Sequence, residues 1–246
     1  MKLTGKNPVI ERLRSNPATI RKIYLQEGFQ DAAYIYKKAK QRGIPVFVTL
    51  PSRLLKMARN TNTQGILAEV EDFSYMPYEE LLDMAFEKKK SPLFLDGLND
   101  PQNLGVILRS LACLGKFCVV IPRHESVEVT EAVLRVASGA DNYVPLAKVG
   151  NLATAIQLAK EKGFSIAGAV VKDGISLMET HFPFPMGLVV GSEQKGIRDV
   201  VRRHLDLEVT IPMNIDTLSF NVAQATTIIC YEIARQKLLH HKVKDS

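Results

Sequence analysis

Asn103 and Arg109 are the first residues whose types and placement could support chemistry. They follow an apolar run, 93–95, and a stretch rich in turn-forming residues, 96–101. An apolar run, a turn and then a periodic apolar segment predict a buried strand that leads into a helix. Open α/β sheets bind ligands beyond the carboxyl ends of their strands, so this placement favours a binding site. The alternative is a helix N-terminus followed by a surface arginine, since residues six apart do not share one helical face.

A second group, Gly191, Glu193 and Gly196, follows the apolar run 187–190. Its glycines are five residues apart, as in a phosphate-binding loop, but the Lys-Ser/Thr pair that such a loop requires is missing. No Gly-x-Gly-x-x-Gly follows a predicted strand either, which disfavours a nucleotide-dependent oxidoreductase. The alternative for Glu193 is a carboxylate placed at a helix entry by the helix dipole.

The third group surrounds a proline that ends a predicted strand. A polar loop then leads into a long apolar helix. Ser219 is well placed to cap this helix, which is the alternative to a role in a site. The residues of interest here are Ile211, Met213, Ser219, Phe220 and Asn221.

The wider pattern predicts an α/β protein in which strands alternate with helices. We expect a domain at 1–75, a charged linker at 76–91 and a second domain at 92–246. Continuous apolar runs such as 117–121 favour a parallel sheet covered on both faces. The predicted strands are 20–25, 44–49, 66–70, 93–96, 117–121, 143–146, 164–170, 187–190 and 207–211. The predicted helices are 9–14, 30–42, 51–60, 78–87, 102–114, 130–138, 151–162, 194–203 and 220–239.

Composition restricts the classes of function. The 246 residues are 46% apolar and 24% charged, and no apolar run approaches the ~18 residues of a membrane span. Three cysteines without Cys-x-x-Cys spacing and five histidines without a His-x-x-x-His pair argue against a disulfide framework or a metal site. The N-terminus lacks the apolar core of a signal peptide. We therefore expect a cytoplasmic protein without a metal or a membrane partner.

The excess positive charge lies in the first quarter of the chain. Residues 1–59 contain 13 lysines and arginines against 3 acidic residues, a net +10, whereas residues 91–246 contain 16 of each kind. A basic segment with folding periodicity suggests a module that binds a polyanion, with RNA or DNA as the first candidates. The alternative is a solvated lysine-rich surface. The residues predicted to bind RNA are Arg12, Arg14, Arg21, Lys22, Lys37, Lys38 and Lys40.

Together, the three groups resemble the motifs of the SpoU (TrmH-type) family of RNA ribose 2′-O-methyltransferases, in the SPOUT class. The segment from Asn103 to Arg109 is similar to the family's Asn-x-Gly-x-x-x-Arg pattern, and the glycine-bounded turn at 191–196 resembles its second motif. The third motif is represented by Ile211, Pro212, Met213, Ser219, Asn221 and Val222. The N-terminal part resembles the family's substrate-binding domain, including a Gln-Gly loop at Gln64-Gly65. The layout is similar to that of the bacterial 23S rRNA guanosine 2′-O-methyltransferases.

This resemblance implies a C-terminal, mostly parallel sheet whose chain forms a trefoil knot, preceded by a smaller α/β RNA-binding domain. It also implies S-adenosylmethionine as the cofactor, a homodimer, and RNA as the substrate, with 23S rRNA as the first candidate. The cofactor-binding residues implied are Gly191, Ile211, Met213, Phe220 and Asn221. The catalytic residues implied are Arg109, Asn103, Glu193, Ser219 and Asn221.

Physical chemistry restricts the role of Arg109. A guanidinium with a pKa above ~12 is a poor base at neutral pH, and its fork is better suited to gripping a phosphate or stabilising a developing alkoxide. The chain also departs from the family at Thr63, Gln194, Ile215 and Ala223, where histidine, a small residue, glycine and serine are usual. Isoleucine cannot adopt the positive φ values open to glycine. The alternatives are therefore an RNA-binding paralogue without methyl transfer, or the same activity on tRNA.

Overall fold

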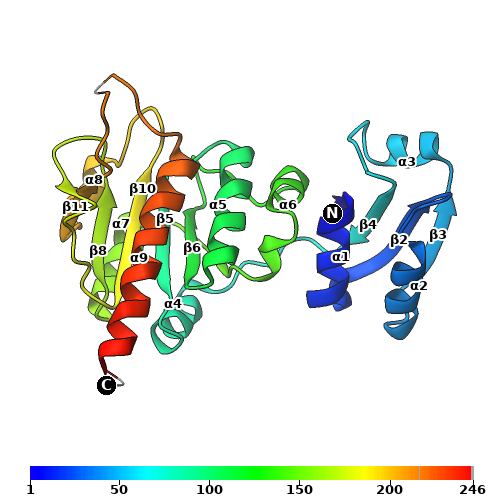
Figure 1. Ribbon diagram of the computed structural model, residues 1–246, viewed down its shortest axis with the longest axis horizontal. Helices are drawn as coiled ribbons and strands as arrows, with labels where there is room; N and C mark the ends of the chain where they lie inside the picture. The colour runs from blue at the N-terminus through cyan, green and yellow to red at the C-terminus, as the bar shows by residue number, and fades with distance from the viewer. Residues whose placement is uncertain (216, 245–246) are drawn as a thin grey trace. The chain divides into compact units, whose positions relative to one another are not determined.

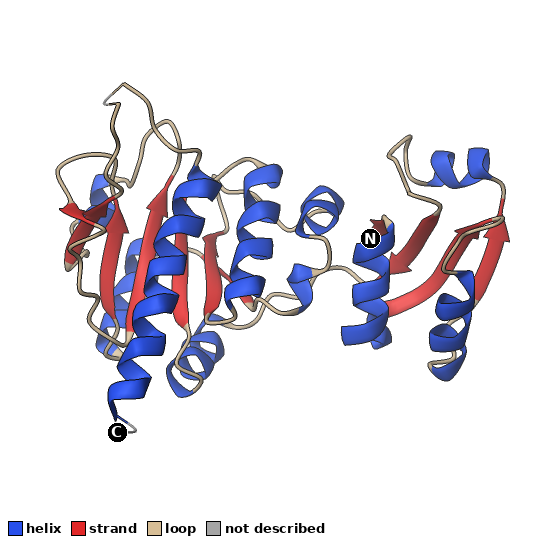
Figure 2. Ribbon diagram, viewed as in Figure 1, coloured by secondary structure: helices blue, strands red, loops and turns tan. Residues whose placement is uncertain are grey.

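The computed structural model describes residues 1–215 and 217–244 (Figures 1 and 2). Their contacts divide the chain into two compact units. Unit 1 contains residues 1–74 and 128–143, and unit 2 contains residues 75–127 and the chain from 144 onward. None of the helices described is long and apolar enough to cross a membrane.

Unit 1 is built on a four-stranded sheet. In spatial order its strands are β1 (Lys2–Thr4), β4 (Ile66–Val70), β2 (Ile20–Gln26) and β3 (Val46–Thr49). β4 runs antiparallel to β1 and β2, and β3 runs parallel to β2 as an edge strand. The helices of the unit are α1 (Lys6–Ser15), α2 (Ala32–Gln41), α3 (Pro51–Met57) and α6 (Glu131–Ala137), with 3₁₀ turns at Pro17–Thr19 and Ala140–Asn142.

Residues 128–143, predicted as part of the second domain, pack with the N-terminal sheet. Val133 and Leu134 of α6 are buried, and the Glu131 carboxylate accepts a hydrogen bond from the backbone N–H of Lys2 at 2.6 Å. The carboxylate of Asp141 forms a buried ion pair with Arg12 of α1. Burial raises the pKa of Asp141, while the positive charge of Arg12 acts in the opposite direction.

The ion pair corrects one prediction about RNA binding. Arg12 was predicted to contact RNA, but its side chain is buried, and it also donates to the Thr19 hydroxyl at 3.1 Å. Removing one partner of a buried ion pair costs about 3–5 kcal/mol, because the other charge is left without compensation. Arg12 therefore holds the segment around Asp141 in unit 1 instead of facing a ligand.

Unit 2 is built on a seven-stranded parallel sheet. In spatial order its strands are β7 (Leu146–Val149), β6 (Phe117–Pro122), β5 (Ser91–Asp96), β10 (Met186–Gly191), β8 (Ser165–Ala169), β11 (Leu207–Thr210) and β9 (Ile175–Ser176). Its helices are α4 (Tyr78–Glu87), α5 (Pro101–Leu114), α7 (Leu152–Glu161), α8 (Asp199–Arg202) and α9 (Val222–Lys244). The α/β class with a large parallel sheet is as predicted, and the trefoil knot stays a prediction.

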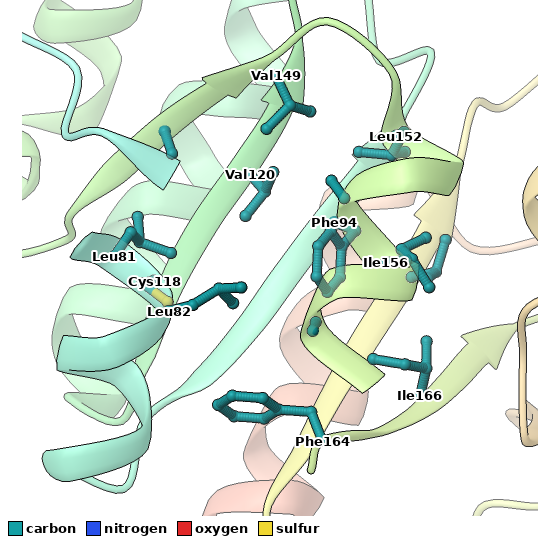
Figure 3. Packing of buried hydrophobic residues seen from close by; sticks show 14 of the residues in the cluster. Leu81, Leu82, Phe94, Cys118, Val120, Val149, Leu152, Ile156, Phe164 and Ile166 are labelled. Atoms are coloured by element: carbon teal, nitrogen blue, oxygen red, sulfur yellow. The ribbon is translucent and has the colours of Figure 1, made fainter. Parts of the chain in front are cut away.

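Helices α4 and α7 cover one face of this sheet, where a hydrophobic cluster fills the space between them (Figure 3). Leu81 of α4, Phe94 of β5 and Ile156 of α7 are all fully buried in it. Burying one such side chain stabilises the fold by about 1.5–3 kcal/mol. The segment 76–91, predicted to be a linker, therefore contributes a core helix. Helices α5 and α9 lie side by side over the sheet, as Figure 1 shows.

Several elements differ in extent from their sequence predictions, among them α1, α3 and α9, each by three or more residues at one end. The strand predicted at 143–146 forms as β7 three residues later, because residues 140–142 turn as a 3₁₀ helix. The helix predicted at 194–203 is reduced to α8 because residues 192–196 close a tight turn, in which Gly196 N donates to the Ser192 carbonyl at 2.9 Å. The short strands β1 and β9 have no counterpart in the sequence prediction.

Candidate functional site

A cavity of about 650 Å³ opens where β8, β10 and β11 end and α9 begins. This is the carboxyl edge of a parallel sheet, where ligands bind in open α/β folds. Every residue predicted to hold the cofactor lines it, namely Gly191, Ile211, Met213, Phe220 and Asn221. Glu193 and Ser219, predicted as catalytic, line it as well.

The turn after β10 brings two backbone segments into close contact. A Cβ atom added to Gly191 would lie 2.1 Å from the carbonyl carbon of Gly196 and 2.3 Å from the backbone nitrogen of Ile197. Gly196 has a φ of +64°, in the region that glycine adopts most readily. Only glycine fits at Gly191, because any side chain would force the turn open.

Asn103 connects α5 to the rim of the cavity. Its side-chain amide nitrogen donates to the Glu193 carboxylate, and its amide oxygen accepts from Asn221 Nδ2 at 3.1 Å. The Asn103 side chain is buried, so these bonds satisfy groups that have lost contact with water. One residue from each of the three sequence groups is thereby joined in a single hydrogen-bonded chain.

Asn221 also determines how α9 begins. Its side-chain oxygen accepts from the backbone N–H of Ala223 at 2.9 Å, which satisfies one of the free donors at the helix start. Ser219 was the residue predicted to cap this helix, so that prediction is wrong: Asn221, directly before the helix, makes the bond. Ser219 is exposed and lines the cavity.

Arg109 lies apart from this chain. It is exposed on α5, six residues beyond Asn103, which corresponds to about 9 Å along a helix. It is outside the described lining of the cavity. The structure thus brings Asn103, Glu193 and Asn221 together and leaves Arg109 on the neighbouring surface of the same helix.

A buried carboxylate that the sequence analysis treated only as part of a turn supports the same site. Asp96, the last residue of β5, accepts hydrogen bonds from Arg198 N at 2.8 Å and Arg198 Nε at 2.7 Å. Arg198 Nη2 lies 2.6 Å from the same carboxylate. The interaction ties the end of the turn after β10 to β5. Its only sequence signal is an acid that directly follows the apolar run 93–95.

The loop after β8 also contributes to the cavity, although no motif in the sequence marked it. The lining includes Val171, Lys172 and Asp173, which belong to none of the three sequence groups. Lys195 and Arg202 add positive charge to the lining, and the Arg202 guanidinium binds Glu208, with Nη2 2.6 Å from the carboxylate. Most of the other lining residues are apolar, among them Val170, Val190 and Ile229. Among the described residues, no group of three histidines, cysteines or acids is placed to hold a metal ion.

The basic side chains predicted to bind RNA differ in exposure. Arg14, Arg21, Lys37 and Lys40 are exposed, and Lys38 is half-buried on α2. Lys22 Nζ lies 3.1 Å from the Glu69 carboxylate. Apart from Arg12, these side chains are on the surface of unit 1.

Two family profiles match the chain. The SpoU rRNA Methylase family matches residues 91–231, and a domain described as RNA 2′-O ribose methyltransferase substrate binding matches residues 2–76. A Staphylococcus haemolyticus protein named as a TrmH family tRNA/rRNA methyltransferase is 32% identical, over 99% of this chain and 98% of its own length. A Synechocystis protein named as a tRNA/rRNA methyltransferase is 36% identical over 81% of this chain, which spans 52% of that relative's length.

Solved structures share the fold. The SpoU methyltransferase AviRb from Streptomyces viridochromogenes, in complex with AdoMet, has a TM-score of 0.81 at 20% identity, over 97% of this chain and 90% of that one. An RNA methyltransferase of the TrmH family from Porphyromonas gingivalis has a TM-score of 0.70 at 26% identity, over 96% and 89%. The family profile covers more than half of the chain, and the chain therefore belongs to the SpoU rRNA methylase family, a family of RNA methyltransferases.

Proposed function

We propose that the protein transfers a methyl group from S-adenosylmethionine to a ribose 2′-hydroxyl of RNA, with 23S rRNA as the first candidate substrate. The observation that carries this proposal is the hydrogen-bonded chain from Glu193 through Asn103 to Asn221 at the rim of the cavity. It supports the proposal because Asn103, expected on the substrate side, is hydrogen-bonded to Asn221, expected on the cofactor side.

The cavity fits S-adenosylmethionine in size and chemistry. Small-molecule sites typically have volumes of about 300–1,000 Å³, and this one has about 650 Å³. The close approach of Gly191 to Gly196 leaves backbone groups on the wall that a side chain would otherwise cover. Gly191, Ile211 and Phe220 would hold the adenosine through backbone and apolar contacts. When bound, the cofactor supplies an electrophilic methyl group on a sulfonium.

The protein's own residues would then align the ribose and stabilise charge. Asn221 would hold Asn103 in place, and Asn103 would in turn hold the Glu193 carboxylate, which lines the cavity. Arg109 is exposed on α5 and carries a permanent positive charge, so it suits the phosphate of the RNA or the developing alkoxide. Its pKa makes it a poor proton acceptor at neutral pH.

Two departures from the residues usual in the family, Ile215 and Ala223, suggested an inactive paralogue. Neither residue is in the described lining of the cavity. Ile215 is 56% exposed and is outside the described lining. It is also not among the described non-glycine residues with positive φ, so its β-branch is tolerated by the backbone. Ala223 is buried in the first turn of α9 and provides the N–H that Asn221 caps. These positions favour an active enzyme over a paralogue that only binds RNA.

We also propose a homodimer in the cytoplasm. Helix α9 exposes Tyr231 and Leu238, at 60% and 61%, and the neighbouring α5 exposes Val106. Apolar side chains on adjacent helices form the kind of surface that a second subunit covers. An RNA substrate and three free thiols favour the cytoplasm.

The test measures methyl transfer from labelled S-adenosylmethionine to unmodified ribosomal and transfer RNA, followed by nucleoside analysis. We expect label on a ribose 2′-oxygen of rRNA. Label on tRNA alone would redirect the proposal to that substrate, and no calorimetric binding of S-adenosylmethionine would contradict it. Arg109→Ala should lose methyl transfer while retaining cofactor affinity, because Arg109 lies outside the cavity; an active variant would remove Arg109 from its proposed role.

A further inference from the structure

One face of the small sheet in unit 1 exposes a pair of stacked aromatic rings. Tyr24 of β2 and Phe47 of β3 are direct neighbours in the parallel pairing of the two strands. Their ring centroids are 5.6 Å apart, and the ring planes are inclined by 30°. The opposite face of β2 is closed, since Ile23 and Leu25 are fully buried. At β2 the sheet therefore has one buried face and one face with aromatic rings, whereas at the β3 edge the same face that is buried at β2 is open and Val48 is 58% exposed.

The inner ring of the pair is fixed by its neighbours. The Tyr24 hydroxyl donates to the Glu69 carboxylate at 3.2 Å. The ammonium of Lys22 lies 5.7 Å from the Tyr24 ring centroid and 3.1 Å from the same carboxylate. Tyr24 also packs with Leu54 and Leu67 where α3 crosses this face. A ring held in this way gives Phe47 a rigid surface to stack on.

The outer ring is open to solvent. Phe47 is 49% exposed and lies on an edge strand, beyond the part of the face that α3 covers. A large aromatic side chain left half in water on an edge strand is a liability for solubility unless a ligand or partner covers it. Phe47 thus offers one flat face, supported from behind by Tyr24.

We propose that Phe47 is a stacking platform for an unpaired base of single-stranded RNA. Proteins that bind unpaired bases place aromatic rings on a sheet surface, with cations nearby for the backbone phosphates. Unit 1 has the charge for this partner, because its residues include 14 lysines and arginines against 9 acidic residues, a net +5. The same charge disfavours a second copy of this chain at the β3 edge, since like charges would meet there. The inference rests on RNA being the substrate and adds that its bound segment is single-stranded.

The composition of the chain allows a direct test. The protein contains no tryptophan, so Phe47→Trp introduces a single fluorescent reporter on the platform. Stacking of a base on this ring should quench its emission in a saturable way when a single-stranded oligouridylate is added. A blunt RNA duplex should quench it much less. Val48→Trp is the matched control: Val48 is the next residue of β3, points to the other face and is 58% exposed.

A second variant measures the contribution to affinity. Phe47→Ala should weaken binding of the single-stranded RNA by about 5- to 150-fold, the range expected for losing one stacked base. Phe47→Tyr should restore it, because the ring is retained. Equal thermal unfolding of the variants will show that the sheet is intact. Equal quenching in Phe47→Trp and Val48→Trp, or unchanged affinity of Phe47→Ala, would overturn the proposal.

Other outcomes separate this inference from the proposed function. Emission of Phe47→Trp that changes with protein concentration and not with RNA would identify a self-association surface, and would also overturn it. If the unaltered protein methylates RNA while Phe47→Ala binds RNA normally, only the platform is wrong. If the unaltered protein binds S-adenosylmethionine but no RNA, the proposed RNA substrate fails as well.

Discussion

The cavity of unit 2 and the aromatic face of unit 1 are constructed in opposite ways. The cavity depends on backbone segments that approach within contact distance and on the buried amide of Asn103, which is hydrogen-bonded to Glu193 and Asn221. The aromatic face depends on exposed side chains, with Phe47 half in water and with the Lys22 ammonium 5.7 Å from the Tyr24 ring centroid. The first arrangement allows almost no change of residue, whereas the second allows exchange of one ring or one cation for another.

This difference reflects the ligands that the two regions are proposed to bind. A small cofactor needs a rigid binding site, because positioning errors of about 1 Å reduce the rate of a transfer reaction. An RNA strand is long, flexible and highly charged, and much of its affinity comes from electrostatic contacts that need no exact geometry. A single substitution should therefore reduce ligand binding strongly at the cavity of unit 2 and only moderately on the surface of unit 1.

The largest effect is expected at Gly191. Gly191→Ala should weaken S-adenosylmethionine binding by roughly 100-fold, because the new methyl group overlaps the backbone of Gly196 and Ile197. Calorimetry measures the affinity. Gly150→Ala is the control: an added Cβ meets nothing within 4 Å at this glycine of the same unit. Normal binding by Gly191→Ala would show that the turn is less rigid than its geometry implies.

Asn103 should give the next largest effect. Asn103→Ala leaves Glu193 and Asn221 without their shared partner, and methyl transfer should fall by about 30- to 100-fold, because a hydrogen bond to a charged group contributes roughly 1.5–3 kcal/mol. Single-turnover rates measure this loss. Gln102→Ala changes the exposed neighbour on α5 and should leave the rate unchanged. A similar loss in both variants would mean that the helix, and not the amide of Asn103, is responsible.

Lys237 tests how the stability of unit 2 responds to pH. This lysine of α9 is 8% exposed and donates to the Lys89 carbonyl at 3.1 Å, and burial lowers its pKa to about 8. Between about pH 8 and 10.5 the unfolded chain holds the proton that the folded protein has released, so this group makes stability rise with pH. Lys237→Met should stabilise the protein by about 2 kcal/mol at pH 7, and the gain should shrink toward pH 10.

Denaturant unfolding of the two proteins at pH 7 and pH 10 measures this difference. Burial also raises the pKa of Cys118, to about 12, and that of Cys230, and the charge of Lys237 lowers both; its removal therefore leaves both thiols protonated in the folded protein up to pH 10. Lys88→Met replaces an exposed lysine of the same unit and should show no such dependence on pH. A gain for Lys237→Met that does not depend on pH would contradict the assigned titration.

The smallest effect is expected on α2. Replacing Lys37, Lys38 and Lys40 by glutamine should weaken RNA binding about tenfold at moderate salt and flatten the salt dependence by about two units of slope. Filter binding at several salt concentrations measures both quantities. Gln replacements of Lys88 and Lys116, exposed lysines of unit 2, form the control. An unchanged slope for the α2 variant would show that these lysines form a solvated surface that does not contact RNA.

Local pattern predicted the elements around the site well. The strand, turn and helix from 93 to 114 formed as expected, because Asp100 caps α5 through the N–H of Gln102 at 2.8 Å and Pro101 occupies the first helical turn. The three polar groups were expected to share one site, and Asn103, Glu193 and Asn221 are bonded to one another in the structure.

Long-range pairing of charges was the part that sequence reasoning missed. Arg12 was assigned to RNA because its neighbours are basic, yet it pairs with Asp141, 129 residues away. Asp96 was treated as a turn residue, although it binds Arg198 across 102 residues. Periodicity and capping depend on residues within a few positions, whereas the partner of a buried charge depends on how distant segments pack. The pattern of a single sequence therefore does not identify the partner of a buried charge.

The hydrogen bond between Asn103 and Asn221 has a consequence for biosynthesis. It joins residues 118 positions apart, so the ribosome must complete most of unit 2 before the rim of the cavity exists. A nascent chain that ends before α9 has the strands of the sheet but lacks the cavity wall formed by Val222, Ala225 and Ile229. The cofactor can therefore stabilise the finished protein by mass action, but it cannot guide the earlier steps of folding.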